Sequence, residues 1–292
     1  MLVERRVDPL RRSPQGSFFL RRILLTGTAV GFLSLFVILP LVLIFAKAFS
    51  GGLALYWRAV SDPLALSAIG LTALAAGIAV PLNLLFGLCA AWAIAKFDFL
   101  GKGLLTSLID LPFSVSPVIA GMIYVLVFGL QTPLGRWLDA HGLKVVFGVP
   151  GIVLATLFVT FPFVARELIG LMQEQGSEEE EAAVILGAGA WAVFWRVTLP
   201  NVKWGILYGV TLSVARAVGE FGAVSVVSGH IRGRTNTVTL HIENLYNEYQ
   251  FPAAFALASV LTLLAVVTLA LKKAFEGRAE AGVPDPGTGG AG

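Results

Sequence analysis

The side chains best placed to do chemistry are two opposite charges, Arg216 and Glu220, within a long apolar run. A charged group near the middle of a bilayer costs about 2.5 to 3.5 kcal/mol on insertion scales, so each must face protein or water. Spaced four residues apart on a helix, they share one face. Two roles stay open for them: an ion pair that locks helices together, and a site along an anion pathway.

The partners of these two charges are also open at this point. Arg placed four residues before Glu is the weaker order for a pair within one helix, so a partner on another helix is also plausible. Ala215 and Gly219 each lie one position before a charge, and together with Ala223 they predict a stripe of small residues for close helix contact.

A second polar feature is the run of carboxylates Glu178 to Glu181, where a helix N-terminus favours negative charge. Gly187 and Gly189 tolerate left-handed backbone, and Pro200 suits the start of a new helix. The pattern predicts a short helix, a bend and a re-entry over residues 178–200, which we interpret as a docking element. Four residues recur every fourth position and predict one helical face: Ala182, Leu186, Ala190 and Phe194.

Other chemistry is missing from the sequence. No G-x-x-x-x-G-K-[ST] phosphate-binding motif occurs, so we expect no ATP site on this chain. His141, His230 and His241 have no His or Cys partner at metal-ligand spacing, and no nucleophile with a base is evident. We therefore expect neither an enzyme nor a cofactor or metal on this chain. A membrane-embedded enzyme, the weakest alternative, would need such a cluster.

The composition predicts an all-α integral membrane protein. Hydrophobic residues make up 57% of the 292 residues and charged residues 13%, about half the charge content of a globular protein. The lipid bilayer is thus an expected partner. Nucleic acid is not, because the basic residues lie beside apolar runs and form no single basic face.

Six stretches have the length of a membrane span. Residues 1–22 form a basic N-terminal segment, residues 23–275 the membrane domain, and residues 276–292 a Gly- and Pro-rich tail expected to be flexible. A cleaved signal peptide is the alternative for the first apolar run, which is longer than a typical signal core. Pro81, Pro112, Pro117 and Pro162 predict kinks or broken helices. The predicted spans are 23–46, 66–95, 104–130, 151–171, 205–228 and 251–271.

The distribution of Lys and Arg predicts the orientation. The basic residues on the side of the N-terminus outnumber those on the other side, so both termini and residues 178–200 are expected in the cytoplasm. On the outer side, Leu134, Trp137 and Leu138 form an amphipathic patch, and the 229–250 loop is polar. Both outer segments could meet a soluble partner or be ordinary solvated loops.

The 178–200 stretch resembles the E-A-A loop of ABC-importer permeases, with Val197 in place of the usual Ile. The resemblance implies a type I importer fold of about six helices and a cytoplasmic loop that docks on a separate ATPase subunit, where ATP and Mg²⁺ would bind. The matching residues are Glu181, Ala182, Ala183, Leu186, Gly187, Leu199 and Pro200.

A finer resemblance links Arg216 to Ala223, RAVGEFGA, to oxyanion permeases for sulfate and molybdate. Residues 111–121, 158–167 and 224–233 are similar to W-type permease subunits of sulfate/thiosulfate importers. This implies four things: a T-type permease subunit, two copies of an ATP-binding subunit, an external sulfate/thiosulfate-binding protein, and residence in the cytoplasmic (inner) membrane of a bacterium.

Two alternatives remain at the level of function. A molybdate or tungstate permease is the nearer one, because tetrahedral dianions differ little in what a pore must offer. A secondary transporter or channel is the other, since six apolar helices with a buried charge pair would suit it. Neither a secondary transporter nor a channel needs a docking loop, so residues 178–200 favour the importer.

Overall fold

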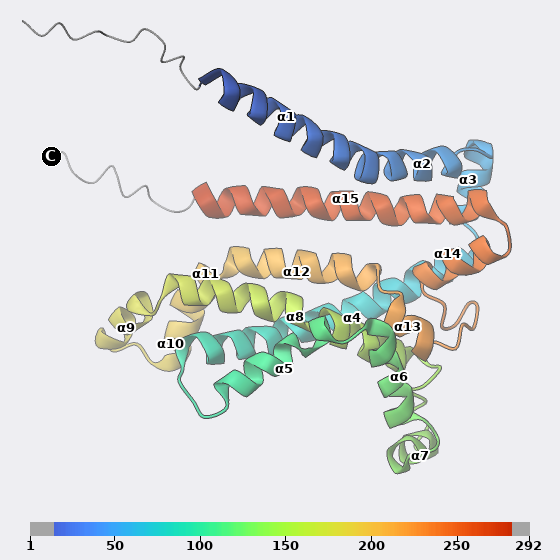
Figure 1. Cartoon of the computed structure of the whole chain (residues 1–292). Coiled ribbons are helices and arrows are strands. Elements are labelled where there is room, and N and C mark those ends of the chain that lie inside the picture. Colours follow the sequence, from blue (N-terminus) through green and yellow to red (C-terminus); the bar gives the residue numbers. More distant parts are fainter. Residues whose placement is uncertain (1–14, 282–292) are drawn as a thin grey trace, which may run out of the picture. The chain divides into compact units, whose positions relative to one another are not determined.

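The computed structural model describes residues 15–281, and within that range every regular element is a helix (Figure 1). The chain forms two compact units, Met1–Ala46 and Lys47–Gly292. Most of the predicted basic segment 1–22 and the tail from residue 282 lie outside the described residues. The all-α prediction is confirmed.

The first unit contains α1 (Gln15–Leu33), the π-helical turn η1 (Ser34–Ile38) and most of α2 (Leu39–Ala48). The second unit contains α3 (Gly52–Val60), α4 (Pro63–Lys96), α5 (Lys102–Ser114), α6 (Pro117–Phe128), α7 (Pro133–Ala140), α8 (Val149–Gln175), α9 (Glu178–Ile185), α10 (Ala190–Val193), the π-helical turn η2 (Phe194–Thr198), α11 (Leu199–Asn201), α12 (Lys203–Val218), α13 (Gly222–Val227), α14 (Val238–Asn247) and α15 (Phe251–Ala281).

Four continuous helical stretches among the described residues are long and apolar enough to cross a membrane: Arg21–Ala48, Pro63–Lys96, Val149–Gln175 and Phe251–Leu271. They match the first, second, fourth and sixth predicted spans. Pro81 and Pro162 lie inside α4 and α8 without ending them. The last helix continues to Ala281, so residues 276–281, assigned to the tail from sequence, are helical.

The third predicted span, 104–130, is not straight. It consists of α5 and α6, which meet at 108° and count as one broken span or as a re-entrant pair. Pro117 has no N–H to continue the helix, and the residue before a proline is driven to extended backbone. Ser116 adopts φ −57°, ψ 134°, and the chain turns there.

The fifth predicted span, 205–228, is not one helix. The 16-residue α12 ends at Val218, and the six-residue α13 begins at Gly222 after a break. With α5 and α6 counted as one span, the described chain therefore has up to five candidates in place of the six predicted from hydropathy. The reason for the break is the environment of Glu220, described below.

The second unit is built around α8, which packs against α4 on one side and α12 on another. Glycines allow these approaches: a Cβ added at Gly87 of α4 would lie 3.2 Å from the Ala165 nitrogen, and one at Gly209 of α12 would lie 3.3 Å from the Val164 Cα. The small buried stripe of α12 is Gly205, Gly209, Ser213 and Ala217.

The predicted stripe of Ala215, Gly219 and Ala223 is therefore wrong. Gly219 lies beyond the end of α12, so the three residues do not share a helix face. Ala223 does make a close contact, but with α6: a Cβ added at Gly121 would lie 2.7 Å from the Ala223 oxygen.

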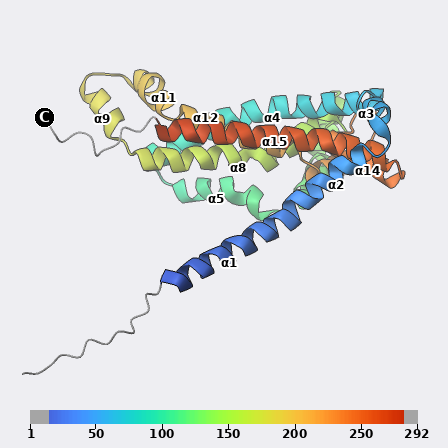
Figure 2. The ribbon, with the colours of Figure 1, turned by 90° about the horizontal axis from the view of Figure 1, so that it is seen from above.

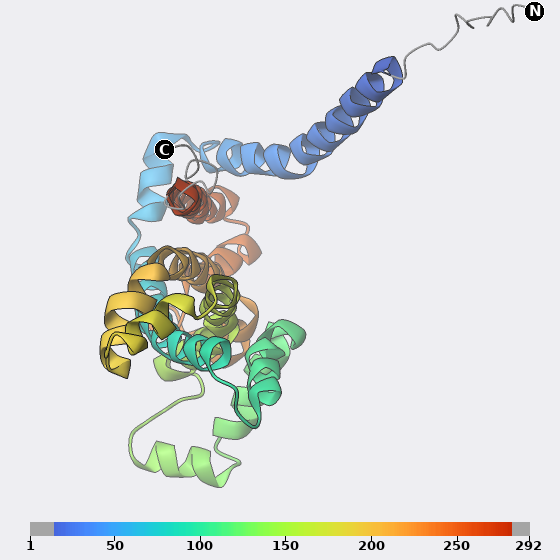
Figure 3. The same ribbon diagram turned by 90° about the vertical axis from the view of Figure 1, so that its left-hand side faces the viewer.

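Short helices lie at both ends of the long helices of the second unit. Figure 1 shows α9, α10 and α11 together at one end of α8 and α12, with α13 and α14 toward the other end. Figure 2 shows the same separation between α9 and α11 on one side and α14 on the other. Figure 3 looks onto the α9–α11 end and shows the short helices of residues 178–201 in front of the long ones. The loop and the Arg216–Glu220 region are thus separated along the helix axes.

Candidate functional site

Residues 178–200 fold as a helix, a bend and a second helical segment, as predicted. Helix α9 ends in a Schellman motif, in which Gly187 N–H donates to Val184 O at 2.9 Å and Ala188 N–H to Ala183 O at 3.0 Å. Gly187 has φ +89° and takes the left-handed position that this motif needs. Gly189 has φ −73°, so the expectation of left-handed backbone holds for Gly187 and not for Gly189.

The prediction of a single helical face is wrong because the helix ends at the bend. That face was to contain Ala182, Leu186, Ala190 and Phe194. Helix α9 ends at Ile185, and α10 starts at Ala190 in a different direction after the bend (Figure 1). The four residues recur at every fourth position in the sequence. No single helix spans all four positions, so their side chains are not aligned.

Apolar side chains of this loop are exposed. Ile185, Leu186 and Trp191 expose 85%, 88% and 75% of their surface, and Val184 and Trp195 are exposed too. Large exposed apolar groups clustered beside polar ones are typical of a protein-protein contact. In the isolated chain, an apolar surface around the bend is therefore exposed and available for contact with another protein.

The E-A-A residues surround that surface. Glu181, Ala182, Gly187 and Pro200 are exposed, while Ala183 and Leu199 are half-buried. The Glu181 carboxylate accepts a hydrogen bond from the Ser177 hydroxyl at 2.5 Å, which holds the first turn of α9. The residues singled out from the sequence therefore lie in one small region at one end of the unit.

A neighbouring carboxylate, Glu180, makes a contact that the sequence did not reveal. Its Oε1 lies 2.8 Å from Lys96 Nζ at the end of α4, and it accepts a hydrogen bond from Thr198 Oγ1 at 3.2 Å. Only 8% of the Lys96 side chain and 17% of the Glu180 side chain are exposed.

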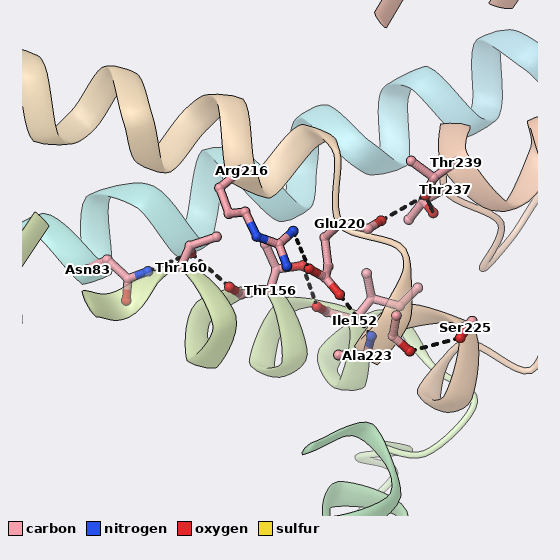
Figure 4. A network of polar contacts seen from close by, with 11 residues as sticks. Asn83, Ile152, Thr156, Thr160, Arg216, Glu220, Ala223, Ser225, Thr237 and Thr239 are labelled. Atoms are coloured by element: carbon pink, nitrogen blue, oxygen red, sulfur yellow. Dashed lines mark hydrogen bonds and ion pairs between the residues drawn. The ribbon is translucent and has the colours of Figure 1, made fainter. Parts of the chain in front are cut away.

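At the far end of α12, Arg216 and Glu220 pair with each other, Arg216 Nη1 lying 2.6 Å from Glu220 Oε2 (Figure 4). The alternative of a partner on another helix is not needed for either charge. Glu220 is buried, and its Oε1 accepts from Ala223 N–H at 2.8 Å. Its carbonyl accepts from Thr239 Oγ1 at 2.7 Å.

These bonds explain the break between α12 and α13. A carboxylate that accepts from an early N–H of the next helix acts as a cap, because it satisfies a donor that has no partner within that helix. Glu220 does this for α13, while its own carbonyl accepts a hydrogen bond from Thr239 in the first turn of α14. The buried glutamate thus joins three elements.

Two further polar features within the apolar helices were missed. Asn83 of α4 donates to Thr160 Oγ1 at 2.8 Å and to Leu157 O at 3.1 Å, which links α4 to α8 (Figure 4). Arg166 of α8 donates through Nε and Nη2 to the two carboxylate oxygens of Asp110 in α5. Arg166 thus lies within a long apolar helix and has an acidic partner on a neighbouring one.

The two segments predicted to lie on the outer side both contain a helix, α7 and α14. Leu134 and Trp137 are exposed on α7, as the amphipathic patch requires. In the 229–250 segment, however, Thr237 and His241 are buried, and burial lowers the pKa of the His241 imidazole. Arg232 pairs with Glu248 there. Among the described residues, no group of three or more His, Cys, Asp or Glu side chains could hold a metal ion.

Comparison with known proteins gives a consistent result. A family model described as "Binding-protein-dependent transport system inner membrane component" matches residues 83–280. The chain is 52% identical over 248 residues to the sulfate transport system permease protein CysW of Escherichia coli K12, which covers 85% of each chain. It is 36% identical over 243 residues to the CysT permease protein of the same strain, covering 83% of this chain and 88% of CysT.

The fold is similar to that of a chain in a solved transporter structure. A chain in the crystal structure of a bacterial ABC transporter that imports the acidic polysaccharide alginate superimposes with a TM-score of 0.72 at 16% identity. The match covers 94% of this chain and 99% of that one. The two chains therefore share the same arrangement of helices.

Proposed function

Because the chain belongs to the family of binding-protein-dependent transport system inner membrane components, we propose that it is the permease subunit of an ATP-driven importer of sulfate and thiosulfate. Identity of 52% over 85% of the chain to a sulfate permease is the observation that carries the choice of anion. Molybdate or tungstate is the competing outcome.

The 178–200 loop supports the ATP-driven mechanism. It gathers exposed apolar groups, Ile185, Leu186 and Trp191, around a rigid bend at one end of the unit. In the proposed complex, this surface docks on an ATP-binding subunit, present in two copies. ATP and Mg²⁺ bind to that subunit, and the permease chain carries no cofactor.

The remaining partners follow from the family. A T-type permease subunit completes the membrane pathway, and an external sulfate/thiosulfate-binding protein delivers the anion to the outer side, where α7 exposes Leu134 and Trp137. We propose the cytoplasmic membrane of a bacterium as the location, with both termini in the cytoplasm, and no nucleic-acid partner.

Uptake by the reconstituted complex tests the proposal. Vesicles that contain both permease subunits, the ATPase and the binding protein should accumulate labelled sulfate when ATP is present on the cytoplasmic side. Excess unlabelled thiosulfate should compete, and molybdate should compete far less. Uptake of molybdate in preference to sulfate would contradict the proposed anion, and sulfate uptake without ATP would contradict the importer.

A further inference from the structure

The ion pair between Lys96 and Glu180 differs from the other charge pairs at the loop end of the molecule. Lys96 is the last residue of α4, and Glu180 belongs to the first turn of α9. Each carries a favourable charge for its helix end. Their 2.8 Å contact is largely shielded from water, whereas Lys102 and Asp98, also 2.8 Å apart, expose 33% and 98% of their side chains.

Several bonds converge on this pair, which we call the Lys96–Glu180 joint. Lys96 Nζ also donates to the carbonyl of Gly176, directly after α8. Glu180 accepts from Thr198, which belongs to the returning limb of the loop. The ends of α4 and α8 and both limbs of the loop therefore meet at two side chains.

A second set of bonds closes the returning limb. Gln175, the last residue of α8, donates through Nε2 to the Asn201 carbonyl at 3.1 Å. Asn201 Nδ2 in turn donates to the Glu179 carboxylate. These contacts hold the loop base, while the bend itself, at Leu186 and Gly187, remains exposed.

The helices that receive these contacts, α4 and α8, form the most extensive helix packing in the unit. Helices α4 and α8 pack closely along their length, with Gly87 against Ala165 and Asn83 bonded to Thr160. Moving the loop without these helices would separate two shielded charges, which is far costlier than separating exposed ones. A force on the loop is therefore passed to α4 and α8.

We propose that Lys96 and Glu180 are positioning residues that transmit movement of the ATPase-bound loop to α4 and α8. This inference rests on the proposed function, because it requires the 178–200 loop to contact the ATPase. It assigns the transmission step to an ion pair within the permease. Lys96 and Glu180 are distinct from the exposed residues that would contact the ATPase.

The test uses the full importer complex and measures the anion transported per ATP hydrolysed, alongside the amount of ATPase subunit that co-purifies. The variants are Lys96→Met, Glu180→Gln, the double variant and Lys96→Arg, with Lys102→Met as the matched control at an exposed pair. A merely structural contact would change assembly, whereas a transmitting contact changes the ratio in assembled complexes.

We expect Lys96→Met and Glu180→Gln to lower the transport-to-hydrolysis ratio by about tenfold, a typical size for coupling between sites. The double variant should lose no more than the worse single variant, because the two residues act as one unit. Lys96→Arg, which keeps the cation, should retain most of the ratio, and Lys102→Met should leave it unchanged.

Two outcomes would contradict the proposed role of the Lys96–Glu180 joint. One is an unchanged ratio in assembled Lys96→Met and Glu180→Gln complexes, and the other is failure of both variants to assemble, which would make the pair structural only. The variant Leu186→Glu distinguishes failure of this inference from failure of the proposed function. If Leu186→Glu keeps the ATPase bound, the loop is not the contact; if it releases the ATPase while Lys96→Met transports normally, only the joint is wrong.

Discussion

Solvent reaches Arg216 and Glu220 very unequally: 31% of the arginine side chain is exposed and 1% of the glutamate side chain. The arginine side chain is thus partly accessible from outside the chain, and the glutamate side chain is not. Glu220 also caps α13 through Ala223 N–H. Glu220 therefore depends on Arg216 to compensate its buried charge, and a pathway role stays a prediction for Arg216 alone.

This difference predicts that Arg216→Gln destabilises the assembled protein more than Glu220→Gln. Removing the arginine leaves a buried carboxylate uncompensated, which costs roughly 3–5 kcal/mol at full burial and less here because Arg216 is partly exposed. Glu220→Gln keeps an oxygen for Ala223 N–H. The melting temperatures of the purified Arg216→Gln and Glu220→Gln complexes show which variant is less stable.

Sulfate flux per assembled complex then tests the pathway role separately. Flux that falls in assembled Arg216→Gln complexes is expected if the guanidinium lies on the anion route. Unchanged flux in a fully assembled Arg216→Gln complex would exclude that role, and a lower melting temperature for Glu220→Gln than for Arg216→Gln would contradict the stability argument.

Gly187 carries the second prediction at this scale. Its φ of +89° costs an L-residue about 1–2 kcal/mol, so Gly187→Leu should rebuild the bend and misplace the contact surface. Gly189→Leu is the matched control, because Gly189 has φ −73° and open space around its Cβ position. We expect reduced uptake for Gly187→Leu alone. Normal assembly and uptake in that variant would refute the coupling role of the loop.

Among the elements, the crossing of α6 and α13 depends on a glycine that touches backbone. A Cβ at Gly121 would lie 2.7 Å from the Ala223 oxygen and 2.9 Å from Val226 Cβ, closer than real contacts allow. At Gly77, within α4, an added Cβ meets nothing within 4 Å. The two glycines thus differ in packing although both lie inside helices.

Gly121→Ala and Gly77→Ala should therefore change stability in opposite directions. In a helix interior, Ala is favoured over Gly by up to about 1 kcal/mol, which Gly77→Ala should gain. Gly121→Ala should lose about 1–3 kcal/mol by overpacking, because neighbouring backbone must move. Thermal unfolding of the purified protein in detergent measures both. A stabilising Gly121→Ala would mean that α6 and α13 separate easily.

Across the whole chain, membership of the transport family predicts a dependent subunit. The sequence contains no phosphate-binding motif, so the purified chain should neither bind nor hydrolyse ATP. Nucleotide binding and phosphate release by a preparation free of other ATPases are the measurements. Hydrolysis that scales with the amount of this chain would contradict the prediction.

The broken segments bear on the topology of the whole chain. If α5 with α6 and α12 with α13 each cross the membrane once, six crossings return the chain to its starting side. A reporter fused after Gly292 should then be cytoplasmic, as should the N-terminus. An external reporter would mean that α12 and α13 do not complete a crossing, as the five candidate spans allow.

Local rules were enough for several features of this protein. The apolar stretches ending near Ala48 and Lys96 follow from length and hydropathy, and the bend at Gly187 follows from a residue that tolerates positive φ. Such features depend on the chain's own neighbours, so a sequence pattern is sufficient to predict them.

The tertiary structure decided which distant groups meet. Hydropathy alone did not predict that Glu220 would cap α13 and interrupt a span, that Gly205 and Gly209 form the packing stripe of α12, or that Lys96 would reach Glu180. Each depends on which helix faces oppose one another. A single sequence contains the charges and small residues, but only the packing of α4, α8 and α12 determines which of them lie within bonding distance.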